Sequence, residues 1–278
     1  MKEIDENEII VFVDKIKKIS DYDFSEYSDK SLKRRLTKIL FDNNLDFKTF
    51  IQKIEQNKSF LEKIVKDITV NTTELFRDPL IWNSIRYEVL PLIRNQMPVN
   101  IWHAGCSTGQ EVYSMLILLN ELGLYDKSDL YATDINSDVL EIARTGIYNY
   151  HFNLNYLDNF DKVIRQSRTG ENIDVEYSKY FIIDKTRDFF KMHSFLTDKP
   201  VYRKMDLVRD TNPFPVKYDL IICRNVIIYF NYELQNKVLK LFYDNLRAGG
   251  CLILGVHETI LGPISAYFEK KYQGYFKK

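Results

Sequence analysis

The hydrophobic and polar positions of the chain change their spacing part-way along the sequence. Over residues 1–68, apolar residues recur every three or four positions, as on one face of an amphipathic helix, and neither glycine nor proline occurs. Polar pairs at residues 43–44 and 57–58 are expected to form turns. The pattern therefore predicts a small helical domain, with helical segments at residues 9–19, 31–40 and 47–65.

A connecting stretch at residues 69–98 follows this helical domain. It contains the end of the run ITVNTTELFRDP and then a helical pattern over residues 82–95. Pro79 suits the first turn of that helix, and Asp78 is the expected N-cap residue. We therefore interpret residues 69–98 as a linker that carries one helix.

From residue 99 to 278, short apolar runs alternate with helical periods. Strands that alternate with helices predict an α/β fold with a parallel sheet and helices on both of its faces. Residues 148–199 break this rhythm, and their runs 180–184 and 188–193 predict an inserted small antiparallel β-subdomain. The strands expected in the main sheet are 100–104, 129–133, 200–206, 218–223 and 251–256, and the expected helices are 111–123, 137–146 and 233–250.

The ends of the first two expected strands indicate a ligand site. The first strand runs into GCSTG, where Gly105 and Gly109 let ligand atoms approach the backbone closely, and the second ends on Asp134. An acid in that place can accept both hydroxyls of a ribose. The loop has neither the GxGxxG spacing of dinucleotide folds nor the lysine of a phosphate loop, which disfavours a triphosphate. Glu111 follows the loop, either to meet the cationic end of a ligand or to favour the helix dipole.

Later elements narrow the class of ligand. The polar pair Arg224-Asn225 follows the fourth strand, and two glycines lie between a helix and an apolar strand in NLRAGGCLILG. Ligands of open parallel sheets bind at the carboxyl ends of the strands, where Gly105, Asp134 and this pair are expected to meet. This layout is typical of Rossmann-type methyltransferases that use S-adenosylmethionine.

Five strings of the sequence resemble one family. ITVNTTELFRDP, IWHAGCSTGQEVYS, YATDIN, CRNVIIYFNYELQ and LRAGGCLILG resemble, in this order, the chemotaxis receptor glutamate methyltransferases known as CheR. The resemblance implies a helical N-terminal domain and a Rossmann-type domain with a small antiparallel insert. It also implies methyl transfer from S-adenosylmethionine to glutamate side chains of a methyl-accepting chemoreceptor's cytoplasmic helical bundle. The products would be S-adenosylhomocysteine and glutamyl methyl esters, which a partner methylesterase removes.

The family's functional positions carry over residue by residue. Where the family usually reads STGEE, this chain has Gln110 before Glu111, and we expect the change to be tolerated because the acid that the family uses is retained. Tyr229 matches a family position near the transferred methyl group. The cofactor-binding residues that the loop and the resemblance imply are Asn71, Thr73, Arg77, Gly105, Glu111, Asp134, Asp206, Leu207, Arg224 and Asn225.

Methylation of a glutamate demands positioning rather than acid–base chemistry. The carboxylate has an ordinary pKa near 4.3 and is ionised at pH 7, so no general base is required. Arg77 and Arg224 are candidates to hold it by two parallel hydrogen bonds. The alternatives are a salt bridge in the linker for Arg77 and a buried pair at a strand end for Arg224. Tyr229 either contacts the methyl group and the glutamate or is a core aromatic residue.

The run SLKRRLTK is basic and contains no acid. Lys33, Arg34, Arg35 and Lys38 lie within it, and positions 34 and 38 share one helical face. A solvated surface helix is the ordinary interpretation of such a run. The resemblance implies instead that this helix approaches the acidic methylation region of the receptor, where complementary charge speeds encounter. A strand edge of the insert could add a surface for a receptor tail.

Composition and charge exclude several classes. The 39 basic and 39 acidic residues balance, which argues against a general nucleic-acid binder. Three distant cysteines, a charged N-terminus and the lack of an apolar run near 18 residues predict reduced thiols in a cytoplasmic protein without membrane insertion. Four histidines without paired spacing predict no metal site, and nothing in the sequence demands more than a monomer.

Two other functions stay open. A methyltransferase acting on a small molecule would need an enclosed pocket, and the specific strings above would then be coincidental. A non-catalytic scaffold that only binds the cofactor would have the replacement at Gln110 as its sole support.

Overall fold

The computed structural model describes residues 4–69, 72–93, 97–151 and 155–278. The contacts divide the chain into two compact units. The helical unit comprises residues 1–70 and 226–237, and the sheet unit comprises residues 71–225 and 238–278. The sequence-derived limits of the linker and of the insert stay a prediction.

The helical unit contains four amphipathic helices at its N-terminal end: α1 (Glu6–Ile19), α2 (Asp29–Asp42), α3 (Phe47–Gln56) and α4 (Lys58–Ile68). Each buries its apolar side, and the ring of Phe12 stacks on those of Phe24 and Phe50. The side chain of Asn57 accepts a hydrogen bond from the amide of Phe60 at 2.9 Å, so this residue ends α3 and caps α4. The turn expected at residues 57–58 is thereby confirmed.

Residues 226–237 complete this unit from a distant part of the chain. They contain the short helix η6 (Ile227–Tyr229) and the start of α11 (Tyr232–Asn245). The amide of Ser28 donates to the carbonyl of Tyr229, and the amide of Asn231 donates to that of Glu26, both at 2.9 Å. These backbone bonds bring Tyr229 into the helical unit.

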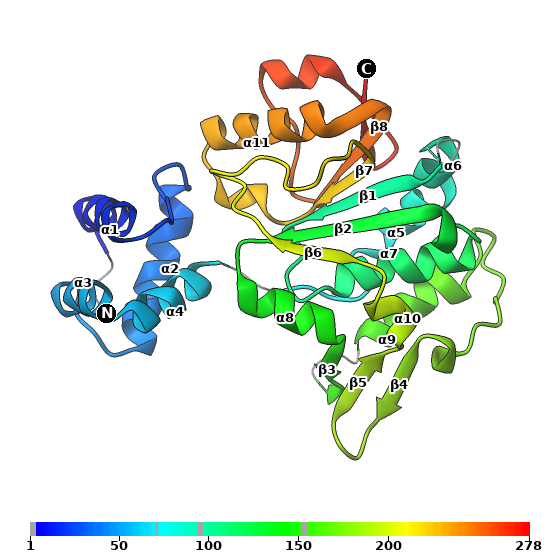
Figure 1. The fold of residues 1–278 in the computed structure, drawn as a ribbon, viewed down its shortest axis with the longest axis horizontal. Coiled ribbons are helices and arrows are strands. Elements are labelled where there is room, and N and C mark those ends of the chain that lie inside the picture. The colour runs from blue at the N-terminus through cyan, green and yellow to red at the C-terminus, as the bar shows by residue number, and fades with distance from the viewer. Residues whose placement is uncertain (1–3, 70–71, 94–96, 152–154) are drawn as a thin grey trace. The chain divides into compact units, whose positions relative to one another are not determined.

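In the part of the chain that the structure describes, the sheet unit is built on seven strands in the order β6-β2-β1-β7-β8-β10-β9, of which the first five are labelled in Figure 1. The first five are parallel, and β10 pairs antiparallel with both of its neighbours. This is the doubly wound order, with the reversal of strand order beside β1. The strands are β1 (Val99–Ala104), β2 (Ser128–Asp134), β6 (Val201–Lys204), β7 (Tyr218–Cys223), β8 (Leu246–Leu254), β9 (Phe268–Lys271) and β10 (Gly274–Lys277).

Helices cover both faces of the sheet. The helices α7 (Gln110–Glu121) and α8 (Ser137–Thr145) lie on one face, and α11 lies on the other (Figure 1). On the α11 side, the ring of Trp102 in β1 packs edge-on against Phe242, 5.5 Å between centroids. Every residue of β1 and β7 is buried, as expected for parallel strands covered on both sides. The predicted Rossmann-type architecture is confirmed.

A second, three-stranded antiparallel sheet forms the insert, in the order β3-β5-β4. Its strands are β3 (Ile147–Asn149), β4 (Phe181–Asp184) and β5 (Phe189–Met192), and α9 (Asn155–Phe160), η4 (Asp161–Arg165), η5 (Tyr177–Lys179) and α10 (Ser194–Thr197) accompany them. The predicted small antiparallel β-subdomain is confirmed. The linker helix is divided into α5 (Pro79–Ser84), the π-helical turn η1 (Ile85–Val89) and α6 (Leu90–Ile93).

The structure differs from the expected elements in three places. The expected strands of the main sheet are parallel, but β9 and β10 add an antiparallel edge that the pattern did not predict. Residues 246–250 belong to β8 and not to the preceding helix, which ends at Asn245, and the two glycines lie at an irregularity of the β7–β8 pairing. Asp78 does not cap α5 with its side chain.

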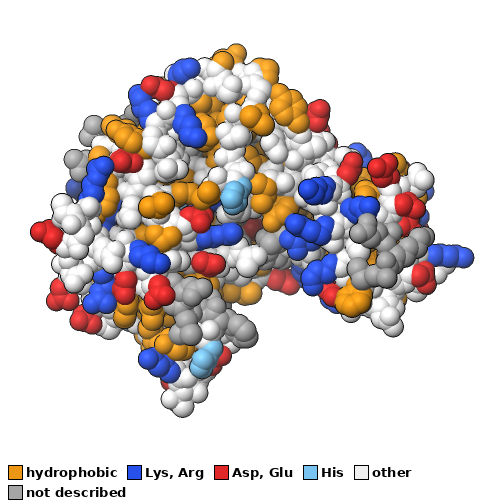
Figure 2. Space-filling model, turned by 180° about the vertical axis from the view of Figure 1, so that it is seen from behind, with side chains coloured by type: hydrophobic (Ala, Val, Ile, Leu, Met, Phe, Trp, Pro, Cys, Tyr) orange, Lys and Arg blue, Asp and Glu red, His pale blue; other side chains and the backbone are white. Residues whose placement is uncertain are grey.

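The side chains exposed on the sheet unit are of mixed type. The face seen in Figure 2 carries basic, acidic and apolar groups interspersed, as expected for a chain whose charges balance. Among the described residues, no helix has both the length and the apolar content needed to cross a bilayer.

Candidate functional site

The glycine loop, residues 105–109, joins β1 to the helical segment that begins with α7. Gly105 and Gly109 have φ of 78° and 91°, which favours glycine. The amide of Gly105 donates to the carbonyl of Thr133 at 2.8 Å and ties the loop to the end of β2. A Cβ at Gly109 would lie 2.8 Å from the Cβ of Ala143 on α8. The loop therefore packs too tightly for a side chain at this position.

Asp134 ends β2 with its side chain buried beneath the glycine loop. Its carboxylate accepts hydrogen bonds from the amides of Ser107 at 2.8 Å and Asn136 at 2.9 Å. Burial raises the pKa of Asp134, and these backbone hydrogen bonds oppose the rise. An ionised carboxylate has about four lone-pair sites, so these two amides do not occupy all of them. The amide of Met205 donates to the carbonyl of Asp134 at 3.0 Å, which brings the segment carrying Asp206 to the same edge of the sheet.

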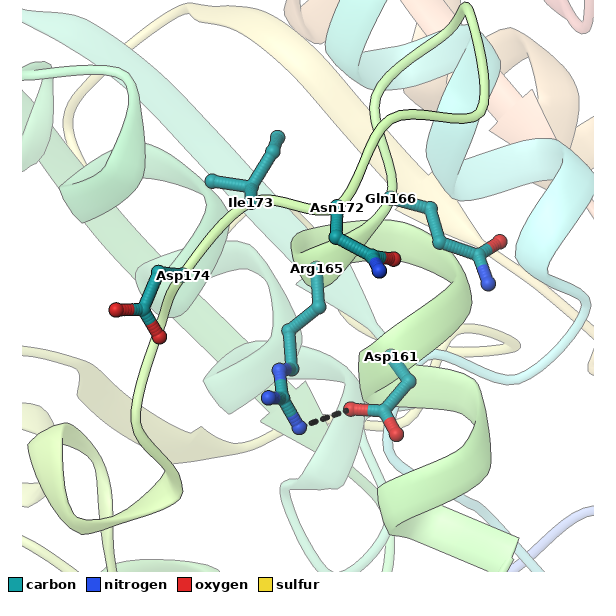
Figure 3. A pocket seen from close by; sticks show the side chains of 6 residues that line it. All are labelled: Asp161, Arg165, Gln166, Asn172, Ile173 and Asp174. Carbon is teal, nitrogen blue, oxygen red and sulfur yellow. Dashed lines mark hydrogen bonds and ion pairs between the residues drawn. The ribbon is translucent and has the colours of Figure 1, made fainter.

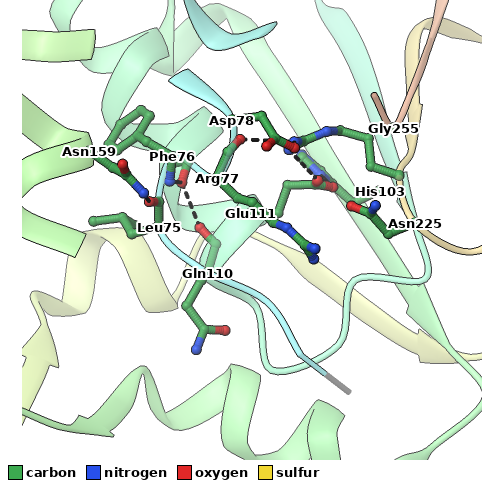
Figure 4. A network of polar contacts seen from close by, with 12 residues as sticks. Leu75, Phe76, Arg77, Asp78, His103, Gln110, Glu111, Asn159, Asn225 and Gly255 are labelled. Atoms are coloured by element: carbon green, nitrogen blue, oxygen red, sulfur yellow. Dashed lines mark hydrogen bonds and ion pairs between the residues drawn. The ribbon is translucent and has the colours of Figure 1, made fainter. Parts of the chain in front are cut away.

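A buried ion-pair network lies at the ends of β1 and β7 (Figure 4). The side chain of Arg224 is only 2% exposed, and it donates to Glu111 Oε2 at 3.1 Å and to Asp78 Oδ2 at 2.6 Å. It also donates to the backbone carbonyl of Arg77 at 2.8 Å. The second oxygen of Glu111 lies 3.0 Å from Nδ1 of His103. One guanidinium thus joins β7, the start of α7 and the linker.

Glu111 stays ionised within this network. Burial raises its pKa, but the hydrogen bond with His103 and the charge of Arg224 outweigh burial and hold the pKa below its ordinary value. Because both oxygens of Glu111 already have partners, its position is fixed before any ligand binds.

The two arginines proposed from the sequence differ in their surroundings. Arg224 matches the alternative of a buried strand-end pair, since its two terminal nitrogens are occupied by Glu111, Asp78 and the Arg77 carbonyl. Arg77 is half-buried, and its guanidinium donates to the carbonyl of Thr72 at 3.3 Å. Within the described residues it has no carboxylate partner, so the linker salt bridge is not formed here. Of the two guanidinium groups, that of Arg77 is therefore the one without a carboxylate partner among the described residues.

The linker around Arg77 adopts an unusual backbone. Phe76 and Asp78 have φ of 51° and 57°, in the left-handed region that bulky residues avoid. The amide of Phe76 donates to Oγ of Ser114 on α7 at 2.7 Å, and Asn159 donates to the carbonyl of Leu75 at 3.3 Å. Sequence reasoning missed Ser114 and Asn159. A signal existed only for Ser114, as a small polar residue within an apolar helix.

Glu258, also missed from the sequence, fastens the ends of β7 and β8. Its buried carboxylate accepts from the amides of Asn225 at 2.8 Å and Gly255 at 2.7 Å. Asn225 itself has a positive φ of 60°. The acid after the fifth parallel strand was visible in GVHET, but its partners are far apart in the sequence.

Several buried polar atoms of this edge have no partner among the described residues: Nε2 of His103, Oγ of Ser107, Nε of Arg224 and Oδ1 of Asn225. Buried polar atoms are nearly always hydrogen-bonded, so such a cluster suits a ligand rich in donors and acceptors. The ribose and amino-acid ends of S-adenosylmethionine have this character. The described residues contain no group of three or more His, Cys, Asp or Glu placed to hold a metal ion.

The remaining residues proposed from the sequence are dispersed. Asn71 lies outside the described residues, and the carbonyl of Thr73 accepts from the hydroxyl of Tyr156 at 3.4 Å. Asp206 accepts from the amide of Val208 at 2.8 Å, and Leu207 beside it is half-buried. Tyr229 and the basic residues of α2 belong to the helical unit, namely Lys33, Arg34, Arg35 and Lys38.

The three cysteines, Cys106, Cys223 and Cys251, are free and buried. Burial raises the pKa of each thiol. They are therefore neutral thiols at physiological pH and not activated nucleophiles.

A separate cavity of about 350 Å³ lies in the insert (Figure 3). Within it, Asp161 accepts from the hydroxyl of Tyr177 at 2.8 Å and from Arg165 at 3.4 Å. Asp161 and Arg165 thus pair with each other inside the cavity. None of the residues proposed for the cofactor site lines it. The cavity is lined by Asp161, Arg165, Gln166, Asn172, Ile173 and Asp174.

The strand order, the glycine loop and the acid at the end of β2 define a Rossmann-type methyltransferase domain. Residues 71–273 match the model described as "CheR methyltransferase, SAM binding domain", and residues 7–69 match "CheR methyltransferase, all-alpha domain". The chain belongs to the CheR methyltransferase family. Its cofactor is S-adenosylmethionine, and the resemblance stated from the sequence is confirmed.

Relatives match the chain over nearly its full length. A Pseudomonas putida protein named Cher3 is 35% identical over 267 residues, covering 95% of this chain and 92% of that protein. A chemotaxis protein methyltransferase of Listeria innocua is 27% identical over 261 residues, covering 93% and 92%. Among solved structures, a TehB-like SAM-dependent methyltransferase from Corynebacterium glutamicum aligns with 68% of this chain and 83% of that chain, at 12% identity and a TM-score of 0.36.

Proposed function

We propose that this methyltransferase esterifies glutamate side chains in the cytoplasmic helical bundle of a chemoreceptor, as part of adaptation in chemotaxis. Relatives named chemotaxis protein methyltransferases support this acceptor class. Within the sheet unit, the observation that carries the proposal is the half-buried Arg77, which has no carboxylate partner among the described residues. A guanidinium in that state can hold a carboxylate by two parallel hydrogen bonds.

The roles of the site residues follow from their contacts. Asp134, fixed by two backbone amides, accepts the ribose hydroxyls of the cofactor. Arg224 pairs with both Glu111 and Asp78 and keeps the linker turn in place. Arg77 then positions the acceptor carboxylate. We retain Thr73, Asp206, Leu207 and Asn225 as cofactor contacts and Tyr229 as a residue close to the methyl group.

The reaction needs no base from the protein. When bound, S-adenosylmethionine would supply a methyl group on a sulfonium; the methyl carbon would bond to a carboxylate oxygen, and the electron pair of the broken carbon–sulfur bond would stay on sulfur. The acceptor glutamate is already ionised at pH 7, so no proton has to be moved. His103 is buried against Glu111, which suits a structural role better than that of a general base. Holding the two reactants in line can contribute roughly 7–11 kcal/mol.

The helical unit supplies the proposed docking surface. On α2, Leu32, Leu36 and Ile39 are buried, whereas Arg34 and Lys38 are exposed on the opposite side. Lys38 pairs with Asp42 at 2.9 Å, an exposed pair that competes only weakly with a partner. The acidic methylation region of a receptor would complement this basic face. The proposed acceptor and a methylesterase that reverses the reaction would both act in the cytoplasm.

The test follows the methyl group. The protein is incubated with methyl-labelled S-adenosylmethionine and membranes that contain receptor, and alkali then releases methanol from esters. Base-labile label on a membrane protein is the expected result. Label on soluble metabolites would establish a small-molecule acceptor, and cofactor binding without transfer would establish a scaffold; either outcome overturns the proposal.

A charge-reversal pair tests the docking surface in the same assay. Arg34→Glu with Arg35→Glu should slow receptor methylation without changing affinity for S-adenosylhomocysteine. Lys18→Glu with Lys48→Glu changes the net charge equally at exposed positions of α1 and α3 and should have a smaller effect. Equal rates for both pairs would remove α2 from the docking surface.

A further inference from the structure

Gln110, the first residue of α7, takes part in a second set of buried contacts beside the ion-pair network. Gln110 is 4% exposed, and Tyr156 on α9 is 3% exposed. The hydroxyl of Thr108 donates to Oε1 of Gln110 at 2.6 Å, and Nε2 of Gln110 donates to the hydroxyl oxygen of Tyr156 at 2.9 Å. The hydroxyl of Tyr156 then donates to the carbonyl of Thr73 at 3.4 Å. These three hydrogen bonds form a continuous series from the glycine loop to the linker.

The direction of the hydrogen bonds in this series depends on the side-chain amide of Gln110. A tyrosine hydroxyl has a single proton, and Tyr156 can give it to Thr73 only if its other neighbour is a donor. The amide of Gln110 is an acceptor toward Thr108 and a donor toward Tyr156, as this requires. An ionised carboxylate is an acceptor only. A glutamate here would therefore accept the hydrogen bond from the Tyr156 hydroxyl, and the Thr73 carbonyl would lose that bond.

Tyr156 keeps its proton at physiological pH. Burial raises its pKa to about 12, although the hydrogen bond from Gln110 opposes the rise. A second tyrosine of the insert, Tyr148, donates to the carbonyl of Thr108 at 2.7 Å, and its ring lies edge-on to that of Tyr156. The insert is therefore fastened to the glycine loop at two points, and only the one through Gln110 continues to the linker.

We propose that Gln110 is a positioning residue that orients Tyr156 toward Thr73 and thereby fixes the linker turn next to the cofactor site. The insert thus contributes to cofactor affinity without touching the cofactor. This inference rests on the part of the proposed function that assigns Thr73 and Arg77 to the site, but not on the identity of the methyl acceptor. Its readout is therefore binding of S-adenosylhomocysteine, which does not depend on the acceptor.

The experiment compares Gln110→Glu, Tyr156→Phe and the double variant in the full chain. Calorimetry should give an affinity for S-adenosylhomocysteine about 3- to 10-fold weaker for each single variant, as expected for one lost hydrogen bond. The double variant should bind no more weakly than the weaker single variant, because both changes remove the same bond to Thr73. Amide hydrogen exchange over residues 72–78 should be faster in both variants before any ligand is added.

Tyr180→Phe is the matched control. Tyr180 is a buried tyrosine of the same insert, and its hydroxyl bonds to Asn120 and Glu121 at the far end of α7. This variant should lose stability but keep its cofactor affinity and its slow exchange over residues 72–78.

Two results would overturn the inference. Unchanged affinity in Gln110→Glu would mean that the amide has the opposite orientation and that Tyr156 donates to it. An undiminished effect of Gln110→Glu in the Tyr156→Phe background would mean that residue 110 acts on the cofactor directly. If the parent chain binds S-adenosylhomocysteine normally, neither result bears on the proposed acceptor.

Discussion

Replacing Arg224 by methionine tests whether the ion-pair network is the main support of the site. Methionine has a similar length and no charge, so the change removes the guanidinium while largely filling its space. Three acceptors lose their donor: Glu111, Asp78 and the carbonyl of Arg77. The consequences can be worked out from the exposure of the two carboxylates.

The loss of stability should come mainly from Glu111. Removing one partner of a buried ion pair costs about 3–5 kcal/mol, because the remaining charge stays buried. The side chain of Glu111 is 13% exposed, so its charge would stay buried. The side chain of Asp78 is 36% exposed and reached by solvent, so it adds little to the loss of stability. His103 still bonds to Glu111, so we expect the low end, about 3 kcal/mol. At roughly 2–4 °C per kcal/mol, the melting temperature falls by about 6–12 °C.

The loss should depend on pH in a defined direction. In the parent protein the pKa of Glu111 is depressed, so its stabilisation is present above the pKa of the unfolded chain and is lost as pH falls through the folded pKa. Without Arg224, burial dominates and raises the pKa of Glu111. The folded variant then binds a proton at higher pH than the parent protein. Its deficit is therefore largest near neutral pH and shrinks as pH falls toward the ordinary glutamate pKa of about 4.3.

Urea unfolding at pH 7.5 and pH 5 measures both quantities. Arg247→Met is the control, since Arg247 pairs with the buried Asp219 at 2.9 Å, near the start of β7 in the same sheet. Both variants should be less stable, but only Arg224→Met should also weaken binding of S-adenosylhomocysteine. A loss below about 1 kcal/mol, the range of exposed pairs, would refute the reasoning about buried charge. An equal loss at the two pH values would refute the assignment to Glu111.

Two further substitutions test the edge of the sheet near β2. Asp134→Asn turns an amide group toward the backbone amides of Ser107 and Asn136. Affinity for S-adenosylhomocysteine, measured by calorimetry, should therefore fall at least about tenfold, equivalent to about 1.4 kcal/mol. An unchanged affinity would remove Asp134 from the site. Gly109→Ala places a Cβ 2.8 Å from Ala143 at a φ of 91° and should cost about 1–3 kcal/mol in urea unfolding. Gly123→Ala, with φ of 65° and nothing within 4 Å of the new Cβ, should cost less, and equal losses would show that strain alone is responsible.

Most of the fold could be predicted because its strands are of the buried parallel type. Such strands are buried on both faces and mostly apolar, as YDLIIC in β7 is apart from Asp219, and they stand out from the helical periods between them. The antiparallel pair β9 and β10 could not be found this way. Each has four residues, and in β9 only Phe268 is buried, so neither carries a clear period. Their place in the sheet follows from pairing with β8, which lies outside any local window.

The positions of the site residues were predictable, but their partners were not. Parallel strands end at one edge, which is why Asp134, Glu111 and Arg224 could be expected near one another. The bonds from Arg224 to Glu111 and Asp78 cross 113 and 146 residues of sequence. No local pattern indicates that this arginine is already paired with two carboxylates, whereas Arg77 has no carboxylate partner among the described residues. The sequence treated the two as equivalent candidates, and burial separates them.

The backbone conformation of the linker explains why Asp78 precedes α5, as the sequence had indicated, but does not cap it with its side chain. A cap residue has an extended backbone, whereas Asp78 and Phe76 are left-handed, which costs roughly 1–2 kcal/mol for each. Such a turn persists only where the surroundings compensate, and Ser114 at Phe76 and Arg224 at Asp78 do so. Arg77 lies between these two fastened residues, and among the described residues its side chain makes one hydrogen bond, to Thr72. The methyltransferase fold thus fixes the backbone on either side of Arg77, and the proposed role of its guanidinium in holding a carboxylate depends on this fixed backbone.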